Sequence, residues 1–256
     1  MRITFLGTGT SSGIPIIGCD CAVCASTDPR NKRRRTSLYV EAGGQHILVD
    51  TPPDFREQAL AYRLPRVDAV LFTHAHADHI LGFDDIRRYN TMQNAVIPAY
   101  GSPTTMQDVR RIFDYIGQED VPGFYRPRID FRDIAGPFAI GPVRVEALEV
   151  EHGPKPASGF RFACEGRTLA YVPDCHAMPT AVEDAVRGVD VMILDALRHR
   201  PHKTHLTVRD SVALLQRIGA RRSFIVHMCH DLEHDETRRA LPPGLDVSYD
   251  GLVLEW

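Results

Sequence analysis

Four potential metal ligands lie within six consecutive residues, in the run His74-Ala75-His76-Ala77-Asp78-His79. The run directly follows an apolar stretch, residues 69–72, that has the composition of a buried strand. His74 and His76 are two positions apart, so an extended backbone points both imidazoles to the same side. Imidazole and carboxylate groups bind Zn²⁺ and Mn²⁺. Four such groups this close together indicate a pair of cations that share one site.

A second cluster, Cys19-Asp20-Cys21-Ala22-Val23-Cys24, has C-x-C-x-x-C spacing. Three thiolates this close can bind one Zn²⁺ in a tetrahedral site when a fourth ligand comes from elsewhere. The chain has six cysteines in all, and in a reducing compartment such a cluster favours a metal site over disulfide bonds. The candidates for the fourth ligand are Cys229, His230 and His234.

A framework of short strands is predicted to position these groups. The segments rich in β-branched residues and too short for helices are residues 3–6, 37–40, 46–49, 69–72, 143–148, 159–163, 169–172, 191–194, 223–226 and 253–254. The clearest helix spans residues 208–218, because Thr207 and Asp210 form a capping box before it and Gly219 ends it. A second helix is predicted over residues 103–115. Strands with interspersed helices predict an α+β fold with two mixed β-sheets flanked by helices.

Composition places the chain among ordinary globular proteins. Of its 256 residues 43% are apolar, and the net charge of −3 points to neither nucleic acid nor an anionic membrane as a partner. We expect a single domain over residues 1–256, and a cytoplasmic location because the N-terminus lacks the features of a signal peptide. Residues 117–137 are predicted to form a surface excursion rather than a substrate-facing loop. The basic run at Arg30 and residues 32–35 is interpreted as a solvated loop.

The H-x-H-x-D-H run resembles the signature of the metallo-β-lactamase superfamily. The resemblance implies an αββα sandwich with two metal ions, and three further ligands that each follow a predicted strand. It assigns His74, His76 and His152 to one metal and Asp78, His79 and His227 to the other, with Asp174 as the bridge. Asp50 follows the strand over residues 46–49, where this family has an aspartate that orients a ligand histidine. A helix N-terminal cap before Pro52-Pro53 is the alternative role for Asp50.

The pairing of a cysteine-rich loop with this motif resembles the PhnP-like phosphodiesterases over nearly the whole chain. That resemblance implies a structural zinc held by Cys19, Cys21, Cys24 and His230, and active-site metals that are zinc or manganese. It also implies hydrolysis of small cyclic phosphodiesters, such as ribose cyclic phosphates and 2′,3′-cyclic nucleotides, by a metal-bridging hydroxide. His205 matches a proposed general acid, so Asp78 and His205 are the expected catalytic residues. The substrate is expected to be a small phosphodiester or nucleotide, and a homodimer is a further expectation.

Three other functions fit parts of the sequence. A tRNA 3′-processing endonuclease of the same fold would need an RNA-gripping extension and a basic face, so large nucleic acid is not the expected partner. A thioester or lactam hydrolase would use the same metal ligands. A carrier protein resembling the pyrroloquinoline-quinone factor PqqB would share the cysteine-rich loop. Retention of all seven active-site ligands favours an enzyme over a carrier.

Overall fold

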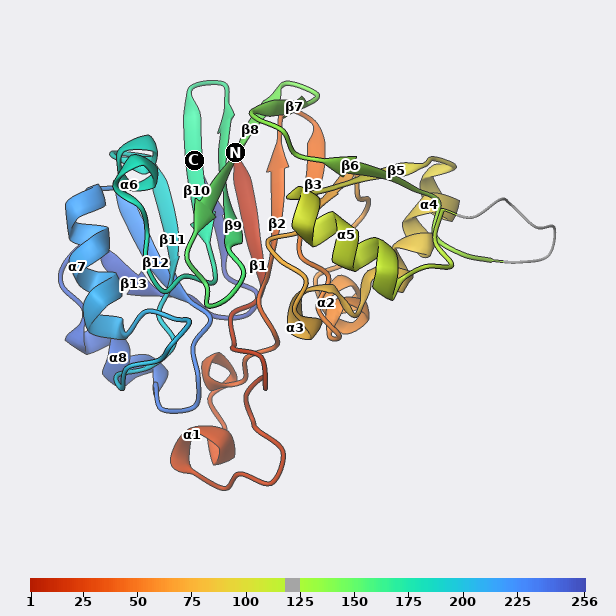
Figure 1. Cartoon of the computed structure of the whole chain (residues 1–256). Coiled ribbons are helices and arrows are strands. Elements are labelled where there is room, and N and C mark those ends of the chain that lie inside the picture. Colours follow the sequence, from red (N-terminus) through yellow and green to blue (C-terminus); the bar gives the residue numbers. More distant parts are fainter. Residues whose placement is uncertain (118–124) are drawn as a thin grey trace.

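Two β-sheets packed face to face, with helices on their outer sides, form the body of the molecule (Figure 1). The computed structural model describes residues 1–117 and 125–256. Within these ranges each sheet has seven strands and contains both parallel and antiparallel pairs. This architecture confirms the predicted sandwich of two mixed sheets flanked by helices.

The two sheets mirror one another in their connectivity. The first has the order β14-β1-β2-β3-β4-β5-β6, with bounds β1 Arg2–Gly7, β2 Ser37–Ala42, β3 Gln45–Val49, β4 Ala69–Leu71, β5 Ile97–Gly101, β6 Ile129–Asp133 and β14 Val253–Glu255. The second has the order β13-β12-β11-β10-β9-β8-β7, with bounds β7 Phe138–Ile140, β8 Val143–Val150, β9 Ala157–Cys164, β10 Arg167–Val172, β11 Val191–Asp195, β12 Arg222–Val226 and β13 Leu245–Val247.

Helices cover the outer sides of both sheets (Figure 1). The first sheet is flanked by α2 Phe55–Ala61, α3 Ala77–Ile80, α4 Arg87–Gln93 and α5 Pro103–Ile112; the second is flanked by α6 Thr180–Val186, α7 Val208–Ile218 and α8 His234–Ala240. The short helix α1 Ala22–Ala25 lies in a loop that projects from the body, and 3₁₀ turns occur at Pro29–Asn31 and Phe83–Ile86. No helix in the described part of the chain has the length and apolar character needed to traverse a bilayer.

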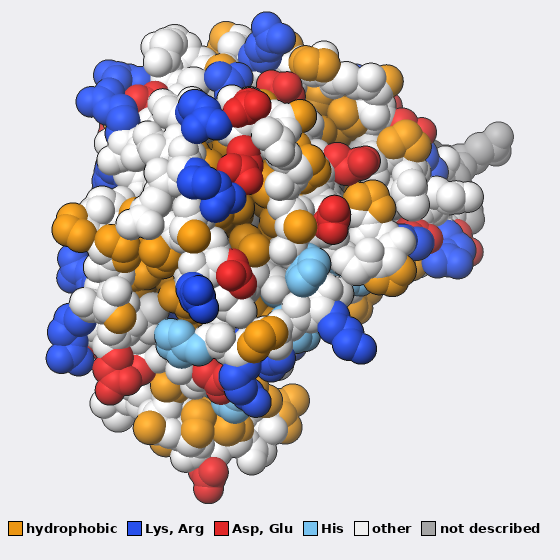
Figure 2. Space-filling model, turned by 60° about the vertical axis from the view of Figure 1, so that its left-hand side comes forward, with side chains coloured by type: hydrophobic (Ala, Val, Ile, Leu, Met, Phe, Trp, Pro, Cys, Tyr) orange, Lys and Arg blue, Asp and Glu red, His pale blue; other side chains and the backbone are white. Residues whose placement is uncertain are grey.

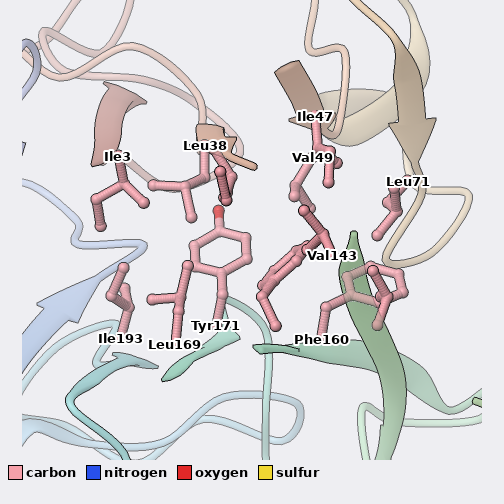
Figure 3. Close-up of a cluster of buried hydrophobic side chains, with 14 of the residues drawn as sticks. Ile3, Leu38, Ile47, Val49, Leu71, Val143, Phe160, Leu169, Tyr171 and Ile193 are labelled. Carbon is pink, nitrogen blue, oxygen red and sulfur yellow. The ribbon is translucent and has the colours of Figure 1, made fainter. Parts of the chain in front are cut away.

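The main core lies between the two sheets. Ile3, Leu38 and Val49 of the first sheet face Phe160 and Ile193 of the second, and all five side chains are fully buried (Figure 3). Side chains of a strand alternate between its two faces, so each strand gives every second residue to this layer. Burying one such side chain contributes about 1.5–3 kcal/mol. This packing therefore fixes the position of one sheet relative to the other. It also fixes the strand ends that carry polar residues.

All ten predicted strands and the helix over residues 208–218 are confirmed. The cap of α7 forms as expected: the Asp210 amide donates to the Thr207 Oγ1 at 3.1 Å, and Gly219 has a φ of 64°. The second helix was predicted to reach residue 115, but α5 ends at Ile112. Phe113 leaves the helical conformation and its ring packs 5.5 Å from that of Phe83. Tertiary packing therefore outweighs helical propensity at this end.

Four strands, β5, β6, β7 and β13, were not predicted. The expectation of a surface excursion over residues 117–137 is wrong for Ile129–Asp133, which pairs with β5 at the edge of the first sheet. This edge strand has a polar sequence, IDFRD, that lacks the apolar run used as the signal. Residues 118–124 of the segment lie outside the described residues.

Strand ends that carry polar residues meet at one edge of the sandwich. The pairs β3/β4, β10/β11 and β11/β12 are parallel. The chain leaves β3 at Asp50, β10 at Asp174 and β12 at His227. Because the carboxyl ends of parallel strands face the same edge, residues distant in sequence are brought together there.

Candidate metal centre

The loop after β4 carries the first group of ligands. His74 and His76 lie on its extended part, and Asp78 and His79 lie in α3, so the backbone curls around a single point. The His74 Nε2 is 2.8 Å from the His76 Nδ1, and the His152 Nε2 is 3.4 Å from that same atom. His152 comes from the end of β8, on the other sheet. Three ring nitrogens therefore converge, as the assignment to one metal requires.

A second group forms beside the first. The His79 Nε2 is 3.4 Å from the Asp78 Oδ2, and the His227 Nε2 is 3.8 Å from the same oxygen. Asp174 lies between the two groups, with its carboxylate oxygens 3.3 Å from the His79 Nε2 and 3.6 Å from the His152 Nε2. The seven residues that the sequence singled out thus meet in two triads with one carboxylate between them.

Buried polar atoms without partners show that this pocket suits cations. The His79 Nε2, the Asp174 Oδ1 and both ring nitrogens of His227 are buried and have no hydrogen-bond partner in the described structure. An unpaired buried polar atom costs about 1–3 kcal/mol, and here several point at one another. Two divalent ions would satisfy the His79 Nε2, the Asp174 Oδ1 and the His227 Nε2, so the donor set fits a dinuclear site.

Electrostatics prepare the ligands for this role. Burial lowers the pKa of His74 well below its ordinary value and lowers that of His152 to about 4, which keeps both rings neutral with a free lone pair. Burial alone would raise the pKa of Asp174. The neighbouring imidazoles, chiefly His227 and His79, outweigh burial and hold that pKa well below the usual range. The bridging position therefore carries a carboxylate.

Asp50 contacts a candidate ligand histidine and does not cap a helix. Its Oδ2 accepts a hydrogen bond from the His79 Nδ1 at 2.7 Å, and its Oδ1 accepts one from the Thr73 amide at 2.8 Å. It is fully buried and has a φ of 62°, a left-handed conformation that costs energy for a non-glycine residue. The residue before α2 is Asp54, four positions later. Of the two roles open from the sequence, the structure therefore supports the orienting one.

His205 reaches the centre from the loop before α7. Its Nδ1 donates to the Asp195 Oδ2 at 2.8 Å, and its Nε2 is 3.9 Å from the Asp174 Oδ2. The ring stacks on His227, with centroids 4.6 Å apart. Asp195 was not predicted as a site residue. It follows a predicted apolar strand, as Asp174 does, and this position could have identified it. The structure thus places His205 beside the candidate metal ligands, with Asp195 as the partner of its Nδ1.

The cysteine cluster is completed by His230. Its Nδ1 lies 3.3, 3.5 and 3.7 Å from the Sγ atoms of Cys19, Cys21 and Cys24. The Cys24 amide donates to the Cys21 thiol and is the main cause of lowering the Cys21 pKa to about 7. The other two candidates for the fourth ligand point elsewhere: the Cys229 Sγ accepts from the Asp231 amide, and the His234 ring packs on Tyr249. Three thiolates and one imidazole are a ligand set typical of structural Zn²⁺ sites.

The basic run beside this cluster is structural, which corrects its interpretation as a solvated loop. Arg33 is buried and donates to the backbone carbonyl oxygens of Cys229 at 3.1 Å and Leu232 at 2.7 Å. Arg30 pairs with Asp28 and Asp235. These contacts tie the N-terminal loop to the segment that carries His227 and His230. A buried guanidinium cannot be distinguished from a solvated one by its local sequence.

Two cavities flank the metal ligands. One of about 380 Å³ is lined by His76 and His152 together with Lys155 and Arg111. The other, of about 410 Å³, is lined by His205, His202 and residues of α7. Histidine side chains also reach the molecular surface beside lysine, arginine and acidic side chains (Figure 2). The first cavity is therefore bordered by candidate metal ligands, and the second reaches His205 but none of the seven candidate ligands.

Comparison with known proteins places the chain in a family and agrees with its fold. A family model described as β-lactamase superfamily domain matches residues 45–228. A curated relative, octanoyltransferase from Porphyromonas gingivalis, is 32% identical over 98% of this chain, but the chain spans only 51% of the length of that protein.

Solved structures show the same similarity. The crystal structure of a diphosphatase from the PhnP family has 39% sequence identity and a TM-score of 0.91, covering 100% of this chain and 97% of that one. Zn²⁺-bound PqqB from Methylobacterium extorquens has a TM-score of 0.82 with full coverage of both chains. At 21% identity, the second similarity shows the fold alone.

Proposed function

The chain belongs to the metallo-β-lactamase superfamily, and we propose that it is a dinuclear metal-dependent phosphodiesterase that hydrolyses small phosphodiesters, cyclic ones included. The observation that carries the proposal is the convergence of two ligand triads on Asp174, with His205 directly beside them. When bound, two divalent ions would supply an activated water and would neutralise anionic substrate oxygens. This suits an anionic substrate that a nucleophile must approach.

The protein's own side chains supply orientation and a proton. Asp50 holds the ring of His79, and the Thr204 carbonyl accepts from the His152 Nδ1 at 2.8 Å, so both rings present Nε2 to the centre. Asp195 does the same for His205, whose Nε2 faces the reacting region. We assign His205, in its doubly protonated form, as the general acid whose Nε2–H protonates the leaving oxygen while its Nδ1–H stays bonded to Asp195. The cavity beside His205 would then hold the leaving group.

The two cavities favour a substrate with a substituent on either side of phosphorus. A diester has such a shape, and so does a diphosphate linkage. The 39% identity to a PhnP-family diphosphatase over the whole chain supports a phosphorus-centred substrate of this kind. A diphosphate linkage is therefore the second candidate for the bond that is cleaved.

The test is hydrolysis of bis-p-nitrophenyl phosphate, 2′,3′-cyclic AMP and diadenosine diphosphate by protein of measured metal content, with Asp78→Ala as the control. Metal-dependent turnover of the first two, lost in the variant, supports the phosphodiesterase. Turnover of the diphosphate alone selects the second candidate. Binding of tRNA in a gel shift, with 3′ cleavage, would instead support the endonuclease.

Thioester hydrolysis enters the same assay as a competitor, because the relative from P. gingivalis is named an octanoyltransferase. Octanoyl-coenzyme A is the probe. Release of free thiol, with no turnover of any phosphorus substrate, would contradict the phosphodiesterase proposal. Full metal occupancy without turnover of any probe would favour a carrier.

A further inference from the structure

A groove on the outer side of the first sheet lies apart from the metal centre. It encloses about 460 Å³ and is lined by residues of α2 and α4. Its floor consists of Phe55, Leu64 and Tyr89, which are all buried. The rings of Phe55 and Tyr89 are 6.2 Å apart, and the Tyr89 hydroxyl donates to the Leu64 carbonyl oxygen at 3.3 Å. These contacts hold the two helices together, so the groove is a built feature of the fold.

Apolar side chains on both walls of this groove are exposed. Leu60 of α2 is 63% exposed and Met92 of α4 is 51% exposed. Single exposed apolar residues are normal on a protein surface, but here two large ones flank an apolar floor. Together they form a surface that would lose water on contact with another apolar group.

The same groove carries a net positive charge. Arg56, Arg63 and Arg88 line it, and none of their guanidinium groups forms an ion pair or a hydrogen bond with the residues that the structure describes. Asp85 is the acidic residue of the lining. Many other arginines of this chain are paired, for example Arg35 with Asp54 at 2.8 Å. Because three arginines line the groove with one aspartate, the groove would attract an anionic partner.

The spacing of the charges defines that partner. Arg56 lies in α2, and Arg63 lies two residues beyond its end, where the chain turns with a left-handed φ of 51°. Arg88 lies on the opposite wall. Several carboxylates on one partner helix would match cations that come from both walls of the groove. A second copy of this chain, docked through the same face, would oppose arginine to arginine.

We propose that this groove docks an acidic amphipathic helix of a partner protein. Its apolar side chains would lie between Leu60 and Met92, and its carboxylates would contact Arg56, Arg63 and Arg88. Docking of a helix by its apolar face into a groove is a common form of recognition. The proposal does not depend on the chemistry of the metal centre.

The experiment measures fluorescence anisotropy of a labelled peptide of about 15 residues, with leucine on one helical face and glutamate flanking it. The comparison peptide has lysine in place of each glutamate. The expected result is that the native protein binds the glutamate peptide at least about tenfold more tightly, less so at high salt. Arg56→Glu combined with Arg88→Glu should reverse this preference. The matched control, Arg144→Glu with Arg167→Glu, changes the same charge at exposed positions outside the groove.

Three results would overturn the proposal: equal binding of the two peptides by the native protein, loss of preference in the control variant, or an unchanged preference in the groove variant. Sedimentation velocity on the same proteins tests whether a second copy of this chain occupies the groove instead. A dimer that the groove variant disrupts would make this face a self-association surface and would also overturn the proposal.

Discussion

The Nδ1 of His205 lies 2.8 Å from the Oδ2 of Asp195, a residue that ends β11 and is fully buried. The same oxygen accepts from the Cys175 amide at 2.9 Å. Asp174, which precedes Cys175, lies between the metal-ligand triads. One carboxylate therefore fixes both the tautomer of His205 and the backbone beside the central ligand, linking the expected general acid to the metal centre.

Replacing His205 by alanine should lower turnover of a poor-leaving-group substrate such as 2′,3′-cyclic AMP by about 10²–10⁴-fold. Bis-p-nitrophenyl phosphate should lose much less, since p-nitrophenolate leaves without a proton. Asp195→Asn should show the same selectivity with a smaller loss. The measurement is kcat for both substrates at matched metal content. Equal losses on the two substrates would contradict the general-acid role.

Asp78→Ala should remove one active-site metal ion and abolish turnover. Asp78 is the carboxylate of the second triad, within 3.4 Å of the His79 Nε2. A site stripped of its charged ligand has a lower affinity for a divalent ion. Elemental analysis after dialysis should fall from about three ions per chain to about two. An unchanged metal count would show that Asp78 does not bind metal.

Asp50→Asn should weaken metal binding without touching a metal ligand. The change removes the charge that holds the His79 Nδ1–H, and outer partners of this kind alter metal affinity by about 10–100-fold. The measurement is competition with a chromophoric chelator, supported by thermal unfolding. An unchanged affinity, with a lower melting temperature only, would reduce Asp50 to a structural residue.

Cys24→Ser should remove the zinc ion of the cysteine cluster and destabilise the fold. That ion would join the N-terminal loop to His230, and its loss leaves only contacts such as those of Arg33. We expect the melting temperature to fall by at least about 5 °C. Cys164→Ala is the control, because Cys164 is buried outside the cluster and should leave the zinc count unchanged. Equal zinc counts in both variants would contradict the assignment.

Asp250 should make stability depend on pH. Its oxygens accept from the Thr8 hydroxyl at 2.8 Å and the Arg34 amide at 2.7 Å, yet burial raises its pKa to about 7. Between about pH 4 and 7 the folded state therefore retains a proton that the unfolded state has lost. The free energy of unfolding contributed by this group should decrease as pH rises through that window, by up to about 1.4 kcal/mol per pH unit, and stay level above it.

Urea unfolding of the native protein and Asp250→Asn at several pH values isolates this contribution. The difference between the two free energies should change between pH 4 and 7. A constant difference would mean that the hydrogen bonds outweigh burial and keep the carboxylate ionised.

The local sequence determined the features whose causes are local. The run from His74 to His79 carries four candidate ligands within six residues, and the cap and the glycine stop of α7 lie directly beside the helix. Strand cores also appear as short runs of β-branched residues. For these features, the number of residues between two side chains already determines how close together they lie.

Only the tertiary structure decided the roles that depend on distant partners. Asp195 and Arg33 acquire theirs from His205 and from the 229–232 loop, and the groove between α2 and α4 exists only once both helices pack on the first sheet. Edge strands such as β6 are stabilised by pairing with a neighbour rather than by their own composition. Burial and pairing are properties of the assembled chain, because they depend on residues that the local sequence does not contain.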